Sequence, residues 1–178
     1  MESDALAGNG TQFGGRMIAM RAGIALGSNL GEREARMEEA FSFLRNLSKS
    51  GRFLRSSLWK SEPVDCPPDS GEFLNAVAEI DWDGSPEDLL ASLLAFERRA
   101  GRLPAEKRQR NSPRPIDLDL LYCGDLVRHS PELTLPHPRL ISRGFVLGPL
   151  AEINPHLRLS GFSRTVKELY DRLIQDHS

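Results

Sequence analysis

The stretch FLNAVAEIDWDGSPED, residues 73–88, decides the fold that the sequence predicts. Phe73–Trp82 is an apolar run typical of a β-strand. Ser85-Pro86-Glu87-Asp88 then predicts a helix start, because serine caps helices, proline fits the first turn, and acidic side chains favour that end of the helix. The earlier segment Phe53–Trp59 also reads as a strand, so we expect a hairpin followed by a helix. This order favours an α+β sandwich over a doubly wound sheet.

The rest of the chain continues this alternation of strands and helices. Further strands are expected over Met20–Leu26 and Ile116–Tyr122. Helices are expected around Met37–Leu47, from Ser85 to a stop at Gly101, in part of Leu140–Ile153, and after a capping box at Thr165–Glu168. The predicted fold is therefore a ferredoxin-like α+β sandwich, with helices packed on an antiparallel sheet.

Length and composition predict one domain and exclude several classes of protein. Residues 1–16 lack periodicity and are expected to be a disordered extension, which leaves 17–178 as a single domain. Cys66 and Cys123 cannot make a disulfide scaffold, and we expect two reduced thiols in a cytoplasmic protein. No apolar run reaches the roughly 18 residues of a membrane span, and no secretory signal is recognised. The net charge of −2 means that any phosphate site must be a local patch.

Two carboxylates stand out in the strand expected over Ile116–Tyr122. Alternation places Ile116, Leu118 and Leu120 on one face and the pair Asp117 and Asp119 on the other, with Cα atoms about 6–7 Å apart. Such close like charges repel each other, whereas a bound divalent cation would make the arrangement favourable. Carboxylates suit Mg²⁺, which also takes water and phosphate oxygens. The alternative is an ordinary solvated strand face, which the bare pair does not exclude.

A basic segment runs directly into this acidic pair. The seven basic residues between positions 98 and 114 are Arg98, Arg99, Arg102, Lys107, Arg108, Arg110 and Arg114, against the single acid Glu106. Arginines neutralise phosphate oxygens through a bidentate fork. The succession of cations and carboxylates therefore favours phosphoryl-type chemistry over a merely solvated loop.

Two other motifs are ambiguous by their residues alone. Thr134, His137 and Arg143 suit phosphate contact, although a histidine between prolines is more often structural. The turn GSNLG at 27–31 stands between a strand and a helix, where phosphates can bind. It lacks the glycine spacing of the known phosphate-binding loops, so a tight turn with a helix cap is the favoured interpretation.

Several segments, in this order, resemble the 6-hydroxymethyl-7,8-dihydropterin pyrophosphokinase family. They are GSNLG at 27–31, FLNA at 73–76, Glu97, Gly101-Arg102, PRPIDLD at 113–119 and LPHPR at 135–139. The resemblance covers about Ala22–Pro155. It implies a ferredoxin-like fold and a reaction of folate biosynthesis. In that reaction ATP donates its β,γ-pyrophosphoryl group to the hydroxymethyl group of the reduced pterin, AMP is released, and two Mg²⁺ ions assist.

The resemblance also implies roles for individual residues. Asp117 and Asp119 would hold both metal ions, and Arg102 and Arg114 would engage the transferring phosphates. The residues around ATP would be Glu97, Arg110, Leu120, Thr134, His137 and Arg143. The pterin would be hydrogen-bonded by Asn75 between the rings of Phe73 and Phe145, in a pocket completed by Gly27, Ser61, Glu62 and Val64. The segment 102–112 would be a lid over ATP, and no nucleic acid, membrane or obligate protein partner is implied.

The chain departs from the family pattern mainly in this lid. Pro104 stands where the family often has a second arginine, for which Arg108 or Arg110 is a candidate replacement. Asn111-Ser112 stands where many members have Trp-Gly, which puts aromatic stacking from the lid in doubt. Phe73 replaces a common tyrosine. Glu132 stands where some members have a basic residue, so that contact with ATP is not expected.

Two other classes of protein fit the residues less well. A nucleotidyltransferase also combines a Gly-Ser turn with an Asp-x-Asp pair, but there the two motifs are expected close together, and Ser28 is far from Asp117 in this sequence. An RNA-binding module on the same topology would need exposed aromatic residues on its central strands, and Ile116–Leu121 offers acids instead.

Overall fold

The central feature of the computed structural model is an antiparallel sheet, and the structure describes residues 19–63, 70–103, 107 and 113–176. The five strands of this sheet are β1 (Met20–Ser28), β2 (Phe53–Arg55), β3 (Trp59–Ser61), β4 (Phe73–Trp82) and β5 (Asp117–Cys123). A separate two-stranded sheet pairs β6 (Arg128–His129) with β7 (Thr134–Leu135). The helices are α1 (Arg33–Leu47), α2 (Pro86–Arg99), α3 (Gly144–Ile153) and α4 (Val166–Asp176).

The strand order confirms the predicted α+β fold. The order β2-β4-β1-β5, with β3 also paired to β4, is that of a ferredoxin-like split βαβ motif if β2 and β3 are taken as one interrupted strand. Strand β1 lies in the middle and pairs with β4 from Met20↔Trp82 to Ser28↔Leu74. On its other side β1 pairs with β5, where Gly27 faces Asp117. The acidic pair therefore begins an edge strand, beside the end of β1.

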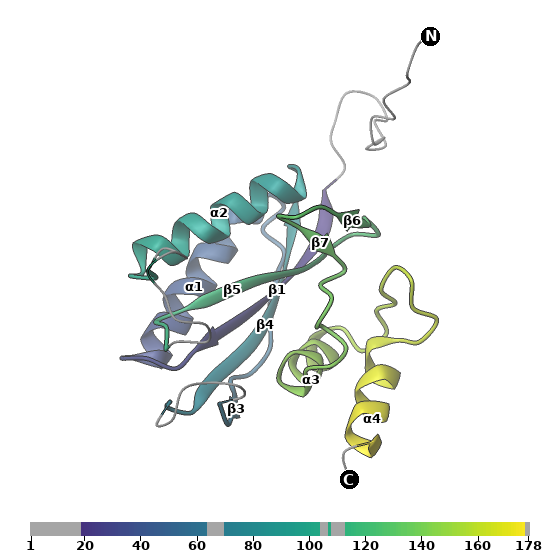
Figure 1. Ribbon diagram of the computed structural model, residues 1–178. Helices are drawn as coiled ribbons and strands as arrows, with labels where there is room; N and C mark the ends of the chain where they lie inside the picture. Colours follow the sequence, from purple (N-terminus) through teal and green to yellow (C-terminus); the bar gives the residue numbers. More distant parts are fainter. Residues whose placement is uncertain (1–18, 64–69, 104–106, 108–112, 177–178) are drawn as a thin grey trace.

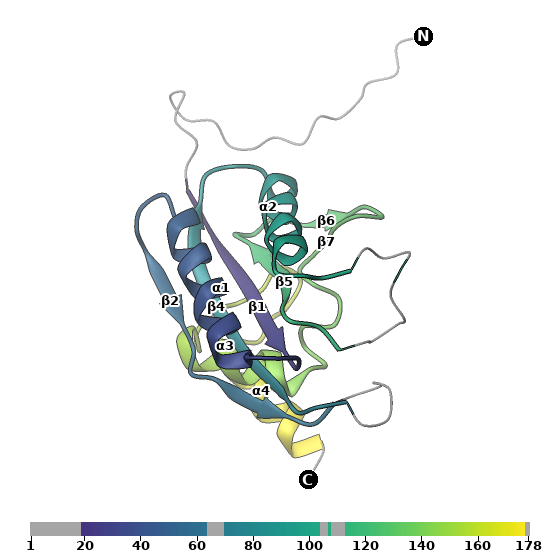
Figure 2. The ribbon, with the colours of Figure 1, turned by 90° about the vertical axis from the view of Figure 1, so that its left-hand side faces the viewer.

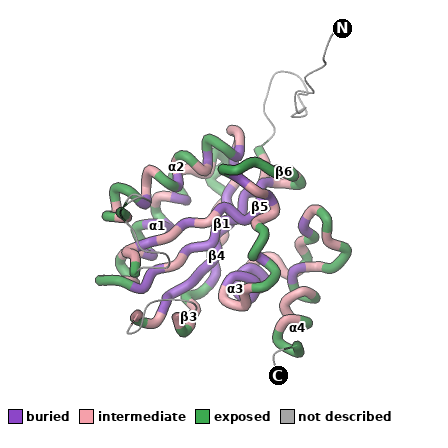
Figure 3. Tube along the Cα trace, in the orientation of Figure 1, coloured by how far each residue is buried: buried purple, intermediate pink, exposed green. Residues whose placement is uncertain are grey.

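Helices cover both faces of the sheet (Figures 1 and 2). Helices α1 and α2 bury Phe41, Leu44, Leu89 and Leu93 against one face. Helix α3 buries its apolar residues against the other face, and α4 packs on α3. The buried colouring of β1, β4 and β5 in Figure 3 reflects this double cover. Sheet strands covered on both faces provide a rigid frame for side chains at their ends.

The helix signals read from the sequence have the expected local geometry. Ser85 caps α2 by accepting a hydrogen bond from Asp88 N at 3.0 Å. The helix ends at Arg99, and Gly101 has φ 95°, a value that suits glycine just after a helix. Before α4, Thr165 N donates to Glu168 Oε2 at 2.7 Å and Glu168 N donates to Thr165 Oγ1 at 3.3 Å, which is a reciprocal capping box.

The structure corrects one prediction about the elements and adds detail that the sequence did not show. The strand expected over Phe53–Trp59 is interrupted, because Ser57 N and Ser57 Oγ donate to Glu152 of α3, each at 2.8 Å, instead of continuing the ladder. Strands β6 and β7 were not expected, since two residues are too few to show a period. The helix expected in part of Leu140–Ile153 is confirmed as α3, which begins at Gly144 after a turn in which Leu140 N donates to His137 O at 3.1 Å.

The remaining expectations concern the N-terminal extension, the two cysteines and membrane spans. Residues 1–16 and Cys66 are not described, so the predicted extension and domain boundary stay predictions. Cys123 is a free, buried thiol. No helix in the described ranges is long and apolar enough to cross a membrane.

Candidate active site

A cavity of about 440 Å³ opens where β1, β4 and β5 meet the start of α3. Six of the seven residues that the resemblance assigned to the pterin line this cavity, and the seventh, Val64, is not described. The six are Gly27, Ser61, Glu62, Phe73, Asn75 and Phe145. Arg114, Asp117, Asp119 and Arg143 line the same cavity. Elements far apart in the sequence therefore bring aromatic, amide and charged groups together.

The orientation of Asn75 is set by its neighbours in the wall. Its Nδ2 donates to Ser61 Oγ at 2.8 Å and lies 3.4 Å from Trp59 O. A Cβ at Gly27 would lie 3.6 Å from Asn75 Oδ1, so the oxygen faces a position with no side chain. Because the amide nitrogen is engaged on the β3 side, Oδ1 is the group left to accept a hydrogen bond from a ligand.

A second cavity of about 300 Å³ lies on the other side of the acidic pair. The residues that line it and that the resemblance assigned to ATP are Glu97, Leu120, Thr134 and His137, and Arg102 lines it as well. Glu132 also lines it and contributes an acidic side chain. Asp119 lines both cavities. Arg110 is not described, and neither are most residues of the expected lid.

Three arginines surround the two aspartates. Arg102 contacts both Glu97 and Asp117 through one nitrogen. Arg114 Nε lies 3.4 Å from Asp117 Oδ2, and an Arg143 nitrogen lies 3.8 Å from Asp119 Oδ2. Within the described part of the chain, Arg102 Nε is buried without a hydrogen-bond partner. The site thus holds cations with donor capacity to spare, as expected where an anionic ligand binds.

Glu97 lies beneath this cluster and is 1% exposed. Its Oε1 accepts a hydrogen bond of 2.6 Å from the backbone N–H of Leu118, which lies between the two aspartates. Burial, followed by the negative charge of Asp117, raises the pKa of the Glu97 carboxyl to about 7, although the Leu118 N–H and Arg102 act in the opposite direction. This carboxyl ties the end of α2 to the strand that carries both acids.

The donor set around Asp117 and Asp119 fits magnesium. Loss of surrounding water, followed by the charge of Asp117, raises the pKa of Asp119 to about 6 despite Arg143 and two other arginines. A divalent cation between the carboxylates would relieve that repulsion. The described residues contain no cluster of three or more candidate metal-ligating side chains, so the other ligands would be water and phosphate oxygens, as Mg²⁺ accepts.

His137 is poised to act as a neutral imidazole. Burial, and then the charges of Arg143 and Arg139, lower the pKa of its ring below the ordinary 6.5. Arg139 N donates to His137 Nδ1 at 3.2 Å. The neutral ring therefore carries its proton on Nε2 and can donate it, without adding a charge to the site.

The structure adds residues that the sequence did not assign to the site. Ser28 Oγ donates to Pro115 O at 2.6 Å, and Asn29 Oδ1 accepts from Arg114 N at 3.0 Å. The turn after β1 thus holds the backbone beside Arg114, a role closer to the expected tight turn than to a phosphate cradle. Arg139 and Ser142 also line the first cavity. For Arg139, its place at the end of the LPHPR motif was an available signal.

The fold and these two adjoining cavities define the class of protein. It is an α+β sandwich whose strand ends hold two adjoining chambers. One is lined by aromatic rings, an amide and three arginines, the other by Arg102, Thr134 and His137, and Asp119 lies in the wall of both. The chain belongs to the 7,8-dihydro-6-hydroxymethylpterin-pyrophosphokinase (HPPK) family, whose sequence profile matches residues 23–155.

Known proteins agree with this membership. The chain is 38% identical over 142 residues to 2-amino-4-hydroxy-6-hydroxymethyldihydropteridine pyrophosphokinase of Pseudomonas aeruginosa, covering 80% of this chain and 85% of that protein. The enzyme of the same name from Haemophilus influenzae is 36% identical over 154 residues, covering 86% and 92%. The crystal structure of wild-type Plasmodium falciparum HPPK-DHPS with pterin and p-hydroxybenzoate superposes with a TM-score of 0.70 at 13% identity, covering 91% of this chain and 44% of that one. That structure supports the fold alone, and this chain spans less than half of its length.

Proposed function

We propose that this chain transfers the β,γ-pyrophosphoryl group of ATP to 6-hydroxymethyl-7,8-dihydropterin, as a pyrophosphokinase of folate biosynthesis. The observation that carries the proposal is the pair of cavities that meet at Asp119. One chamber suits a flat heterocycle and the other suits a nucleotide, and the acids lie at their junction. That is where a phosphoryl group would pass between two substrates.

In the first chamber the chain's own groups would bind and orient the pterin. Phe73 and Phe145 supply aromatic faces for stacking, and Asn75 Oδ1 accepts from an N–H on the pterin edge. Both side chains on β4 are largely buried, so their positions are held by the sheet. We expect a pterin bound in this way to direct its hydroxymethyl group toward the acidic pair.

Where the two chambers meet, the arginines would bind and orient the phosphates, Arg102 from the second chamber and Arg114 from the first. Arg102 and Arg114 are now paired with Asp117, and we expect their guanidinium groups to exchange carboxylate for phosphate oxygens when ATP binds. His137 and Thr134 would donate further hydrogen bonds. Transfer forms a bond from the hydroxymethyl oxygen to the β-phosphorus, breaks the bond from that phosphorus to the oxygen bridging it to the α-phosphate, and releases AMP and the hydroxyl proton.

Asp117 and Asp119 would hold Mg²⁺, two ions by the family resemblance. When bound, Mg²⁺ supplies charge neutralisation for the phosphate oxygens. The chain contributes positioning and electrostatic stabilisation, which dominate catalysis of phosphoryl transfer.

The test is a product assay with protein, MgCl₂, ATP and 6-hydroxymethyl-7,8-dihydropterin. AMP and the pterin diphosphate should appear together in equal amounts. ADP as the nucleotide product would identify an ordinary kinase and overturn the proposal. In a control without the pterin, AMP should not form, because AMP formed without an acceptor would indicate simple hydrolysis of ATP.

A further inference from the structure

We propose that Glu79, far from the reacting groups, is a positioning residue that sets the pterin chamber by holding α3 on the sheet. Glu79 lies on β4 four residues beyond Asn75, about 13 Å along the strand. Its side chain is 0% exposed. This proposal rests on the assignment of the first cavity to the pterin.

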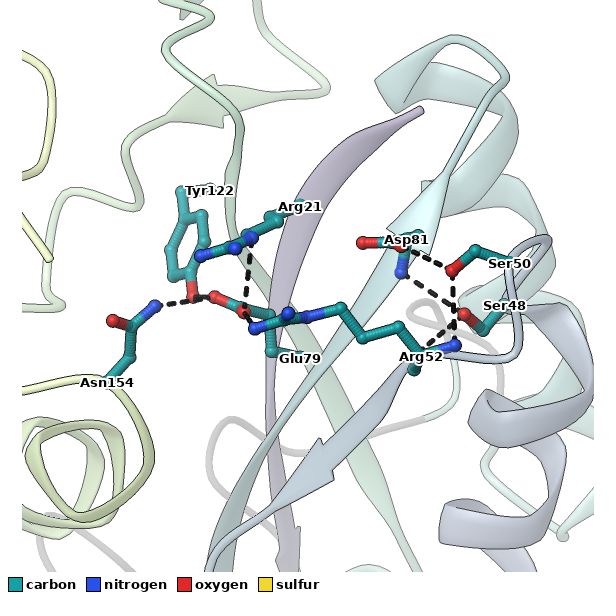
Figure 4. A network of polar contacts seen from close by, with 8 residues as sticks. All are labelled: Arg21, Ser48, Ser50, Arg52, Glu79, Asp81, Tyr122 and Asn154. Carbon is teal, nitrogen blue, oxygen red and sulfur yellow. Dashed lines mark hydrogen bonds and ion pairs between the residues drawn. The ribbon is translucent and has the colours of Figure 1, made fainter. Parts of the chain in front are cut away.

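One carboxylate oxygen of Glu79 joins three elements of the fold. Tyr122 OH on β5 donates to Oε2 at 2.5 Å, and Asn154 Nδ2, directly after α3, donates to the same oxygen at 2.9 Å (Figure 4). The other oxygen lies 3.7 Å from a nitrogen of Arg52 and 4.0 Å from Arg21 Nε. Within the described residues Oε1 has no hydrogen-bond partner, so on that side the buried charge is compensated by the two arginines alone.

The bond from Tyr122 to Glu79 crosses the central strand. Gly23 of β1 pairs with Glu79 on one side and with Tyr122 on the other. A Cβ at Gly23 would lie 2.2 Å from Tyr122 Cε1, so the tyrosine ring lies where a side chain would otherwise be. Burial, followed by the Glu79 charge, raises the pKa of Tyr122 well above its ordinary value, so the hydroxyl remains a donor. Because Gly23 has no side chain, Tyr122 of the edge strand β5 can pass over β1 and bond to Glu79 of β4.

The three elements that meet at Glu79 carry residues of the first cavity at or near their opposite ends. Strand β4 carries Phe73 and Asn75, β5 begins with Asp117, and α3 begins beside Arg143 and Phe145. The Asn154 bond helps to fix the C-terminal end of α3 on the sheet, together with the hydrogen bonds that Glu152 accepts from Ser57 and Trp59. Through this end of the helix, the Asn154 bond contributes to the distance between the Phe73 and Phe145 walls, which is the width available to a pterin ring.

The second cavity gives an internal comparison, because none of its lining residues belongs to α3. Loss of the Asn154 bond should affect the chamber that α3 helps to build and spare the other. A residue with a merely structural role would weaken both chambers together. The two binding affinities therefore separate positioning from general stability.

The experiment measures two dissociation constants on the full chain with Asn154→Ala. In the first titration, 6-hydroxymethylpterin is added in the presence of Mg²⁺ and saturating α,β-methylene-ATP. In the second, α,β-methylene-ATP is added with Mg²⁺ and no pterin. The methylene group of this analogue replaces the oxygen between the α- and β-phosphates and prevents transfer. We expect the pterin dissociation constant to rise about threefold to tenfold and that of the analogue to change less than twofold. Ser160→Ala is the matched control, because it removes a bond of 2.9 Å to Asp125 O that does not involve α3, and both constants should stay at the wild-type values.

Glu79 variants test whether hydrogen bonding is the cause. Glu79→Gln keeps an acceptor oxygen for both donors, so its pterin affinity should lie closer to wild type than that of Glu79→Ala. If Glu79→Ala does not fold, Asn154→Ala decides alone. An unchanged pterin constant in Asn154→Ala, or an equal rise of both constants, overturns the proposal. Asn75→Ala tests the cavity assignment separately: unchanged pterin binding there would refute the proposed function at this site, whatever Asn154→Ala does.

Discussion

Gly148 in the middle of α3 offers a sharp test of how this helix packs. A Cβ at this position would lie 2.6 Å from Trp59 Cζ3, 2.7 Å from Trp59 Cη2 and 3.1 Å from Tyr170 Cε2. Carbon atoms in favourable contact are about 3.5–4.0 Å apart. The Trp59 ring cannot easily move aside, because its Nε1 donates to Glu152 Oε2 at 2.9 Å and its edge packs on Tyr170. Gly148→Ala must therefore push α3 away from β3.

Two opposing effects determine the size of the loss. Alanine is favoured over glycine inside a helix by about 1 kcal/mol. Overpacking a core contact costs about 1–3 kcal/mol, and contacts below 3.0 Å against a ring held on two sides belong to the upper part of that range. We expect Gly148→Ala to lower the free energy of unfolding by about 1–2 kcal/mol, which lowers Tm by about 2–8 °C for a chain of this size.

Thermal and urea unfolding of the purified variants measure this effect. Gly144→Ala is the matched control in the same helix, because a Cβ there has Leu173 Cδ2 as its nearest neighbour at 3.8 Å, an ordinary contact. Its Tm should equal or slightly exceed that of the wild type. Removal of the ring by Trp59→Leu should make the further change Gly148→Ala nearly harmless. A Gly148→Ala protein as stable as the wild type would refute the packing argument.

The remaining predictions concern the acids, α3 and the turn after β1. Asp117→Asn and Asp119→Asn should each lower turnover on the order of 100-fold or more while Tm changes little, and retained activity at millimolar Mg²⁺ would reject the metal assignment. Burial opposes ionisation of Glu152, but three hydrogen bonds outweigh it and lower its pKa. The ionised Glu152 therefore stabilises the fold above the ordinary pKa of 4.5, and this stabilisation is lost as the pH falls through the lowered pKa. Acid unfolding of Glu152→Gln, monitored by circular dichroism, should lack this pH-dependent loss of stability. Ser28→Ala leaves Pro115 O without its donor and should cost about 1–3 kcal/mol in urea unfolding.

Much of the fold could be predicted because its signals are local. The alternation over Ile116–Tyr122 follows from the period of a strand, and the two helix caps at Ser85 and Thr165 follow from neighbouring side chains. The family match was expected over about Ala22–Pro155, and the profile covers 23–155. The interruption between β2 and β3 could not be predicted, because its cause is a carboxylate 95 residues away in the sequence from Ser57.

In the candidate site, too, some residues could be predicted from local sequence patterns and others depend on contacts between distant segments. Asp117 and Arg102 belong to residue patterns with a recognisable chemistry, and Asn75 was assigned through the family resemblance. The structure brings all three to two adjoining cavities. The clamp of Ser28 and Asn29 on the segment beside Arg114 depends on contacts between turns that lie 85 or more residues apart. The burial of Glu97 beneath Arg102 likewise depends on how α2 meets β5, which no spacing in the sequence reveals.

The contacts that Glu97 and His137 make with β5 also occupy part of the open edge of the sheet. Strand β5 ends the strand order and has one side unpaired by β1, which is the kind of edge onto which a foreign strand can add. Along it, Leu118 N donates to the Glu97 carboxylate, and Leu121 O accepts from His137 N at 2.8 Å. An incoming strand would have to displace a buried carboxylate and a backbone bond from the wall of the second cavity. The Glu97 side chain and the His137 backbone, both at the second cavity, thus occupy positions on β5 that an added strand would need.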